Sequence, residues 1–267
     1  PATLQDFERD DNGVHAILDQ GRRLYAPLIV GADGRKSFTR DWLDIDCRSK
    51  NYRQTAVICI ARHENPHDNV AVEHFWPEGP FAILPMRDDK DGNHRSSVVF
   101  TEHGRPADSM IHFDRDAFNL ALRARFPQSY GDVEMQGERS AYPLTLVHAS
   151  RYIDDRMVLI ADAAHGIHPI AGQGLNLGFR DVKELGALLR AAYADKKDLG
   201  SPDILETYQR RRRPDNMAMV AATDALVRLF SNRFPPFRIA RKIGLKAVGR
   251  LPAAKRFFMK QAMADRG

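Results

Sequence analysis

Short runs in which apolar and polar residues alternate dominate the first part of the chain, and they predict β-strands. Residues 4–8 and 14–18 flank Asp10-Asp11-Asn12-Gly13, and an Asn-Gly pair between two such runs is a strong hairpin signal. A third strand is predicted over residues 24–30, which lead into the small residues of a tight turn. The chain therefore begins with three strands, two of them a hairpin.

The same alternation continues through the next hundred residues and predicts an antiparallel sheet. Strands are expected over residues 54–61, 70–76, 81–85 and 96–101, with turn residues such as Asn65-Pro66 and Asp91-Gly92-Asn93 between them. A short helix over residues 114–126 has Asp114 as its N-cap, and a further strand is expected over residues 142–150.

After residue 150 the pattern changes to strand, loop and helix. An apolar strand over residues 157–161 ends at Asp162, a glycine-rich loop covers residues 166–174, and residues 175–192 have helical periodicity. This arrangement presents the amides of a helix N-terminus to a ligand. The apolar positions expected to face the core are Leu175, Phe179, Val182, Leu185, Leu188 and Leu189.

The C-terminal region is helical and basic. A long helix is predicted over residues 203–230, interrupted or kinked near Pro214, and an amphipathic basic helix over residues 237–251. The run of arginines at 210–213 is interpreted as solvated helix surface, with contact to anionic lipid as a minor alternative. Residues 201–267 carry 15 Lys and Arg against 5 Asp and Glu, which favours an anionic partner such as a membrane surface.

Composition excludes several classes of protein. With 267 residues and 43% hydrophobic positions, the chain has enough apolar mass for a folded core. Two cysteines without a pattern exclude a disulfide scaffold and favour a reducing compartment. No run of 18 apolar residues and no signal peptide are visible, so we expect a cytoplasmic location. No known nucleic-acid-binding module is visible, so no nucleic-acid partner is expected.

The most informative segment is His168-Pro169-Ile170-Ala171-Gly172-Gln173-Gly174-Leu175-Asn176-Leu177-Gly178-Phe179-Arg180-Asp181. Gly172 and Gly174 allow the backbone to approach a flat ligand closely, and the helix that follows directs its positive end toward that ligand. Asp162 is placed to accept hydrogen bonds from the hydroxyl groups of a ribose or ribityl chain.

This segment resembles the flavin-dependent aromatic hydroxylases, and within them the ubiquinone-biosynthesis branch. It matches the pattern His-Pro-x-x-Gly-Gln-Gly-x-Asn-x-Gly-x-x-Asp at every fixed position. Residues 30–35 resemble the Asp-Gly motif of the family, and residues 160–165 its Gly-Asp motif, with Ala161 in place of the usual glycine. Residues 79–85 are similar to the strand that faces substrate. The resemblance covers roughly residues 24–263.

The resemblance implies FAD as cofactor and NAD(P)H as electron donor. In such enzymes the donor reduces the flavin, O₂ adds to form a flavin hydroperoxide, and that species hydroxylates a phenol ring. By position, Asp162 contacts the ribityl or pyrophosphate region, Pro169 packs near the isoalloxazine, and Asp33 with Gly34 keeps the Asp-Gly motif in shape. The pyrimidine edge is held by Gly172, Gln173, Gly174, Leu175 and Asn176.

The implied fold is mixed α/β: an incomplete Rossmann-like FAD domain with an inserted antiparallel substrate sheet and a helical C-terminus. Residues 1–48 form the late part of the FAD domain, 49–150 the substrate domain, 151–200 the return to the FAD domain, and 201–267 the basic helical region. The Gly-x-Gly-x-x-Gly segment with which the family opens is not found, so we expect a C-terminal portion of a longer enzyme.

No side chain is assigned as catalytic and none as a metal ligand. His165 and His168 are interpreted as residues that shape the loop by hydrogen bonding, with acid–base catalysis as the alternative.

The predicted function is hydroxylation of a polyprenylated phenol, by an enzyme that rests on the inner face of an anionic membrane. A hydroxylase of a small soluble aromatic and a flavin-free binding or scaffold module stay open as alternatives. Self-association, or assembly into a biosynthetic complex, also stays open.

Overall fold

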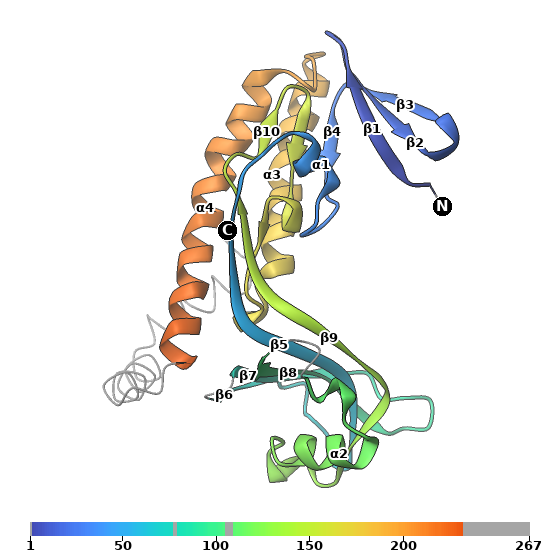
Figure 1. Ribbon diagram of the computed structural model, residues 1–267, viewed down its shortest axis with the longest axis vertical. Coiled ribbons are helices and arrows are strands. Elements are labelled where there is room, and N and C mark those ends of the chain that lie inside the picture. Colours follow the sequence, from blue (N-terminus) through green and yellow to red (C-terminus); the bar gives the residue numbers. More distant parts are fainter. Residues whose placement is uncertain (1, 77–78, 105–108, 232–267) are drawn as a thin grey trace. The chain divides into compact units, whose positions relative to one another are not determined.

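The computed structural model describes residues 2–76, 79–104 and 109–231. They form a mixed α/β fold with a curled antiparallel sheet and a helical C-terminal region, which confirms the predicted fold class (Figure 1). The chain divides into two compact units. The first contains residues 2–50 and 145–224, and the second contains residues 51–144 and 225–231. The basic helix predicted over residues 237–251 lies outside the described residues.

The strands occupy the segments that alternation indicates, but several are longer or shorter than predicted. Their bounds are β1 (Leu4–Arg9), β2 (Val14–Leu18), β3 (Arg23–Ala26), β4 (Ile29–Gly31), β5 (Cys47–His63), β6 (Val72–Trp76), β7 (Gly79–Met86), β8 (His94–His103), β9 (Val133–Ala149), β10 (Ile153–Asp154), β11 (Met157–Leu159) and β12 (His165–Gly166). The helices are α1 (Phe38–Trp42), α2 (Arg115–Arg123), α3 (Gly174–Ala194) and α4 (Pro202–Ser231).

The predicted N-terminal hairpin is confirmed. β1 pairs antiparallel with β2, and the turn closes with a hydrogen bond from the Asp10 amide to the Gly13 carbonyl at 3.0 Å. The Asp10 carboxylate also accepts hydrogen bonds from the amides of Asn12 and Gly13, each at 2.8 Å. An aspartate that bonds to the backbone two or three residues ahead is a common way to fix such a turn.

The single strand predicted over residues 24–30 is wrong. The structure has two strands there, β3 and β4, and they belong to different sheets: β3 pairs with β2, and β4 pairs with β11. Pro27 lies between them. Proline cannot donate a ladder hydrogen bond, so the chain leaves one sheet at that point and enters another.

The first unit contains a short parallel pair of strands. β4 and β11 run in the same direction, with Ile29 opposite Met157 and Gly31 opposite Leu159. The three residues of β11 are fully buried. A parallel pair brings the carboxyl ends of both strands to one edge of the sheet, which decides where the following loops lie.

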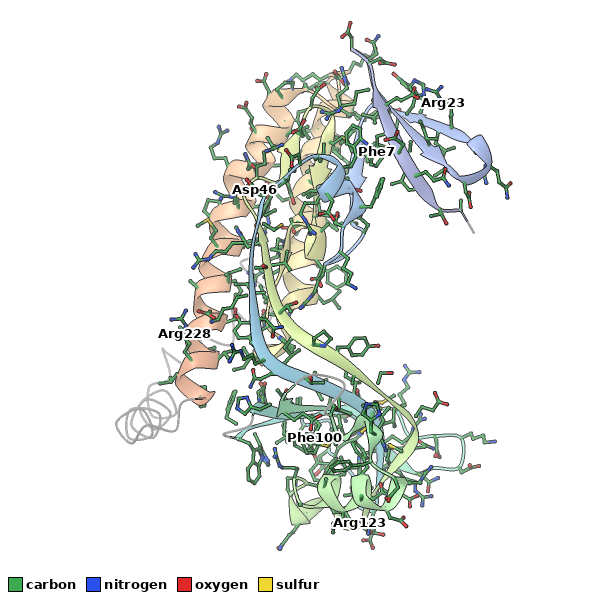
Figure 2. All side chains as sticks on the ribbon, viewed as in Figure 1. Phe7, Arg23, Asp46, Phe100, Arg123 and Arg228 are labelled. Atoms are coloured by element: carbon green, nitrogen blue, oxygen red, sulfur yellow. The ribbon has the colours of Figure 1, made fainter. Side chains whose placement is uncertain are left out.

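The second unit is built on the sheet that contains β5, β9, β8, β7 and β6. β7 pairs antiparallel with β8 and β6, and β5 pairs antiparallel with β8. Phe118 and Leu122 of α2 belong to one buried cluster with Phe81 and Phe100 of the sheet. Figure 2 labels Phe100. Each of these four side chains is 2% exposed or less, and burial of such a side chain contributes about 2 kcal/mol. Asp114 caps α2 as predicted and accepts a hydrogen bond from the Ala117 amide at 2.7 Å.

The predicted core face of α3 is only partly confirmed: Leu185 is buried and Leu188 and Leu189 pack against the core, but the three positions nearest the start of the helix are exposed. Leu175, Phe179 and Val182 are 68%, 61% and 53% exposed, whereas the buried positions are Leu177, Gly178, Asp181, Leu185 and Ala192. The reason is close packing: a Cβ atom on Gly178 would lie 3.0 Å from the Cβ of Ala161. The glycine face is therefore the one that approaches the turn after β11.

The helix α4 continues through Pro214 without interruption. The interpretation of arginines 210–213 as solvated surface is wrong for Arg212, which is 7% exposed. Within the described ranges, no helix is long and apolar enough to cross a membrane.

Candidate functional site

The two predicted flavin motifs follow the parallel strands of the first unit. β4 leads into Asp33, Gly34 and Arg35, and β11 leads into the turn that contains Asp162. Because β4 and β11 are parallel and in register, both loops leave the same edge of the sheet. In open α/β sheets, ligands bind at the carboxyl ends of the strands. The loops therefore lie where this fold class places a ligand.

One guanidinium group joins the two loops. Arg35 donates from Nε to the Asp162 carboxylate at 2.9 Å, from Nη1 to the carbonyl of Thr145 at 2.7 Å, and from Nη2 to the carbonyl of Ile167 at 2.8 Å. A planar fork with several fixed donors suits such a junction. The side chain of Asp162 is nevertheless 41% exposed, so its carboxylate remains accessible to a ligand.

Asp33 organises the turn after β4. Its carboxylate accepts hydrogen bonds from the Ser37 hydroxyl at 2.5 Å, the Thr39 amide at 2.9 Å and the Thr39 hydroxyl at 3.0 Å. Burial raises the pKa of Asp33, but these hydrogen bonds outweigh it and hold the pKa below its ordinary value. The buried Arg40 then donates to the carbonyls of Ala163 and Arg35, at 3.1 and 3.0 Å. Arg40 is thus a second link between the loops.

The glycine-rich loop ends in an open helix N-terminus. Gly172 has a φ of 60°, a conformation that favours glycine, and no atom lies within 4 Å of the position a Cβ would take. α3 begins at Gly174, and its N-cap residue Gln173 makes no side-chain capping hydrogen bond. The amides of the first helical turn have no acceptor within the helix. Those of Gly174 and Leu175 therefore suit an electron-rich ligand.

The buried carboxylate of Asp181, on α3, holds the glycine-rich loop in place through hydrogen bonds. Asp181 is inaccessible to solvent and accepts hydrogen bonds from the Ala161 amide at 2.9 Å, His165 Nε2 at 2.5 Å, Arg212 Nε at 2.8 Å and Asn216 Nδ2 at 3.2 Å. These donors come from the turn after β11, from β12 and from α4. Burial raises the pKa of Asp181, but the bonds from His165 and Arg212 prevail and keep the pKa below its ordinary value.

The two histidines of the motif shape the loop, as predicted. His165 donates to Asp181, and the Nδ1 atom of His168 accepts a hydrogen bond from the Ile170 amide at 3.0 Å. His168 is fully buried, and burial together with the nearby charge of Arg35 lowers its pKa to about 4. His148 is buried as well, and burial with the nearby Arg213 lowers its pKa to about 4.

The structure brings the predicted residues together in one unit, but their contact with a flavin stays a prediction. Asp33 and Gly34 lie in the loop that Arg35 links to Asp162, and Pro169 precedes a short 3₁₀ turn. The residues at the loop's end are Gly172, Gln173, Gly174, Leu175 and Asn176, at and just before the start of α3.

Sequence reasoning missed the residues that support the site, namely Arg35, Asp181 and Arg212. One signal for Asp181 was available: it lies four residues from both Leu177 and Leu185. Positions four apart share one helix face, so an acidic residue between two leucines indicates a paired, buried charge.

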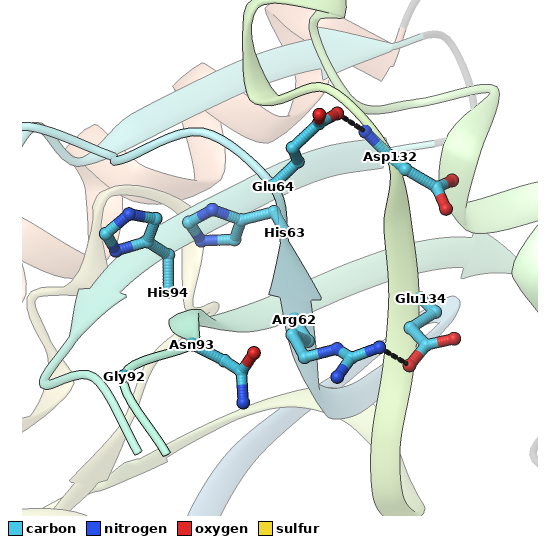
Figure 3. Close-up of a pocket in the computed structure, with 8 residues that line it drawn as sticks. All are labelled: Arg62, His63, Glu64, Gly92, Asn93, His94, Asp132 and Glu134. Carbon is cyan, nitrogen blue, oxygen red and sulfur yellow. Dashed lines mark hydrogen bonds and ion pairs between the residues drawn. The ribbon is translucent and has the colours of Figure 1, made fainter. Parts of the chain in front are cut away.

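The second unit has a separate polar pocket of about 490 Å³ (Figure 3). Arg62 forms an ion pair with Glu134 at 2.6 Å across it, and Glu64 accepts a hydrogen bond from the Asp132 amide at 3.1 Å. His63 stacks on His94 with ring centroids 6.1 Å apart. None of the predicted flavin residues lines this pocket.

Comparison with known proteins identifies the family. The model of the FAD binding domain matches residues 2–223, which is most of the chain. The chain belongs to the FAD binding domain family. Its match spans the loops after β4 and β11, the sheet of the second unit and most of α4.

Curated relatives of this family member confirm the resemblance to the ubiquinone-biosynthesis branch. The chain is 47% identical to the ubiquinone hydroxylase UbiL of Rhodospirillum rubrum, over 98% of this chain and 60% of the relative. It is 33% identical to the 3-demethoxyubiquinol 3-hydroxylase of Escherichia coli, over 98% of this chain and 66% of the relative. It is also 33% identical to the human ubiquinone biosynthesis monooxygenase COQ6, over 92% of this chain and 59% of the relative. The chain thus spans about three-fifths of the length of most of these relatives.

Solved structures agree with this family assignment. The anhydrotetracycline hydroxylase OxyS from Streptomyces rimosus superposes with a TM-score of 0.72 at 27% identity, over all of this chain and 52% of that one. PqsL from Pseudomonas aeruginosa, a probable FAD-dependent monooxygenase, gives a TM-score of 0.71 at 25% identity, over 87% of this chain and 64% of that one.

We predict that Asp181→Asn destabilises the chain by about 3–5 kcal/mol, because the substitution removes the buried negative charge that Arg212 and His165 contact and leaves Arg212 paired with Asp215 alone. Urea unfolding at pH 7 measures the change. The matched control is Glu184→Gln, which removes the partner of the exposed Arg211 and is expected to change the free energy of unfolding by less than about 1 kcal/mol. Equal effects of the two substitutions would contradict the role assigned to Asp181.

We also predict that the free energy of unfolding falls as the pH is lowered from 7 to about 4. His148 and His168 have folded-state pKa values near 4, so below pH 6.5 the unfolded chain binds protons that the folded chain does not. The full difference in pKa between the unfolded and folded states corresponds to roughly 3 kcal/mol of unfolding free energy per histidine. Urea unfolding across this range should give a shallower dependence for His168→Gln than for the wild type. His112→Gln, at an exposed position, should leave the slope unchanged.

Proposed function

We propose that this chain carries the flavin loops and the substrate sheet of an FAD-dependent monooxygenase. Its reaction is hydroxylation of the aromatic ring of a polyprenylated phenol in ubiquinone biosynthesis, with NAD(P)H as electron donor. The observation that carries the proposal is the junction of two loops at the carboxyl ends of β4 and β11, beside an open helix N-terminus. The names of the curated relatives support the same reaction class.

The residues of the two loops fit a flavin. The space beside Gly172 is open, the Asp162 carboxylate is accessible, and Leu175 is 68% exposed at the start of α3. We assign Asp162 to the ribityl or pyrophosphate region and Pro169 to the edge of the isoalloxazine. The residues assigned to the remaining contacts are Asp33, Gly34, Gly172, Gln173, Gly174, Leu175 and Asn176.

Bound FAD would supply the redox chemistry that couples NAD(P)H and O₂ to hydroxylation of an electron-rich ring. The protein's part is to bind, orient and exclude water. The positive end of the α3 dipole and the amides of Gly174 and Leu175 stabilise negative charge on the pyrimidine edge. His165 and His168 keep the loop in place through their bonds to Asp181 and the Ile170 amide, so neither is assigned a proton-transfer role.

The sheet of the second unit offers an apolar face for substrate. Phe81 and Ile83 of β7 point into the core, so Ala82 and Leu84 lie on the opposite face. Ala82 is opposite Val99 of β8, which is opposite Ile58 of β5. Ile58 and Leu84 are 38% and 42% exposed. The same face carries Glu73 opposite Ala82 and Ser97 opposite Leu84, so its aliphatic part is a strip of four residues. Such a strip suits a phenol with a prenyl chain better than a small polar aromatic.

A polyprenylated phenol is a lipid, so the enzyme must take its substrate from a membrane. The net positive charge of residues 201–267 supports association with the anionic inner face of a membrane, with the protein body on the cytoplasmic side. In this proposal the reaction takes place beside the membrane that holds its substrate.

The substitution Gly174→Asp is expected to weaken FAD binding without lowering the stability of the fold. A Cβ on Gly174 would lie 4.0 Å from its nearest contact, so the side chain fits, and an acidic residue in the first turn favours the helix. The new charge repels an electron-rich ring edge, so we expect affinity for FAD to fall at least about tenfold while the melting temperature is unchanged or higher. Flavin fluorescence titration of the longest form of the chain that its gene encodes measures this. Gly174→Ala is the neutral control, and unchanged affinity in Gly174→Asp would refute the assignment.

Leu84→Ser tests the substrate face. Loss of one aliphatic contact should lower kcat/KM for a prenylated phenol by about tenfold. Because Leu84 is exposed, the melting temperature should stay within about 2 °C. Leu120→Ser, at a 72% exposed position on α2, is the control and should retain wild-type kinetics. An equal loss with a phenol that lacks the prenyl chain would favour the alternative, a small soluble substrate.

A further inference from the structure

The four consecutive arginines of α4 divide into two kinds. Arg211 donates to Glu184 at 2.7 Å, and Arg212 donates to Asp181 at 2.8 Å and to Asp215 at 2.7 Å. Arg210 and Arg213 make no ion pair within the part of the chain that the structure describes. They are three residues apart, so they share one face of the helix. Two positive charges on that face are therefore not balanced by a bonded carboxylate.

Both of these arginines line a pocket of about 480 Å³ in the first unit, together with Ser150 and Gln209. The Tyr152 amide donates to Oε1 of Gln209 at 2.7 Å, which fixes the orientation of the side-chain amide. The Nε2 hydrogens of Gln209 are left for another acceptor, and the Ser150 hydroxyl is a further donor. The pocket thus gathers hydrogen-bond donors from two guanidinium groups, an amide and a hydroxyl.

One of these donors is buried. The Nε atom of Arg213 is inaccessible to solvent and has no hydrogen-bond partner among the described residues. A buried N–H group without an acceptor is unfavourable, and in native structures nearly all such groups are paired with protein, water or a ligand. The unpaired Nε of Arg213 is therefore an unsatisfied donor at the pocket, which a bound acceptor satisfies only if the guanidinium turns toward it.

The surroundings of the pocket are positive. Besides burial, the charges of Arg213 and Arg48 lower the pKa of His148. Glu206 is the one carboxylate among the residues that line the pocket, and it forms no ion pair with Arg210 within the described part of the chain. Two guanidinium groups against one carboxylate leave the pocket suited to an anion.

We propose that this pocket binds a phosphoryl group. Arg210 and Arg213 supply charge and paired N–H donors that match phosphate oxygens, and Gln209 and Ser150 supply neutral donors. Free phosphate, the phosphates of a nicotinamide dinucleotide and the headgroup of an anionic phospholipid present the same chemistry. The site is distinct from the flavin loops, because none of the flavin residues lines it.

Isothermal titration of the full chain with inorganic phosphate, at ionic strength held constant with chloride, tests the proposal. Arg213→Gln and Arg210→Gln should each weaken binding at least about tenfold. Arg210 is exposed, so its substitution serves even if Arg213→Gln fails to fold. The control Arg211→Gln, in the same run but paired with Glu184, should change binding by less than about twofold, and Glu206→Gln should tighten it.

Two further probes identify the source of the phosphoryl group. NADPH and vesicles of phosphatidylglycerol, compared with vesicles of phosphatidylcholine, are tested with the same four variants. The probe that loses the most affinity in Arg210→Gln and Arg213→Gln identifies the source of the phosphoryl group. Binding should also raise the pKa of His148 followed by NMR, because the anion offsets the charge of Arg213. The proposal is overturned if none of the three probes loses affinity in these two variants, or if Arg211→Gln loses as much.

Discussion

A carboxylate without access to solvent, Asp181, is the constraint on which the flavin loops depend. It accepts hydrogen bonds from the turn after β11, from His165 and from two side chains of α4. A buried charge is tolerated only when it is paired and hydrogen-bonded, so these segments must keep their relative positions. The start of α3 is thereby held against the end of β11, and its first-turn amides are oriented before any ligand binds.

Arg35 extends this constraint to the second loop. It joins the loop after β4 to Asp162 and to the carbonyl of Ile167, at the edge where two parallel strands end. Asp181 and Arg35 therefore have complementary roles. Asp181 fixes the start of α3, and Arg35 fixes the loop after β4. The proposed flavin site is a consequence of these charged contacts together with the open backbone at Gly172.

Much of the fold could be predicted from local patterns, because hairpins, caps and helical periodicity are local interactions. The Asn-Gly hairpin and the Asp114 cap were predicted correctly for that reason. Pro27 was overlooked as a strand boundary, and the strand over residues 24–30 was wrong in consequence. Apolar periodicity located the buried Leu185 of α3, but it could not find Gly178, which is buried because it packs closely on Ala161, a residue of another element.

In the candidate site, too, local features could be predicted from the sequence and long-range contacts could not. The motif that contains His168 and Gly174 was recognisable from the sequence. Arg35 and Arg212 act through long-range hydrogen bonds, which no local sequence pattern predicts. Ala161, which departs from the family glycine, has a φ of 51°. A left-handed backbone favours glycine at that position, so the structure explains the family preference that this chain does not follow.

The central claim is that the loops after β4 and β11 form one FAD site. The most direct measurement follows the amide NMR signals of Gly34 and Leu175 during titration with FAD, in the longest form of the chain that its gene encodes. The account predicts that both signals shift with a single dissociation constant, because both loops contact one ligand. FAD binding that shifts neither signal, or shifts the two with unrelated dissociation constants, would contradict it.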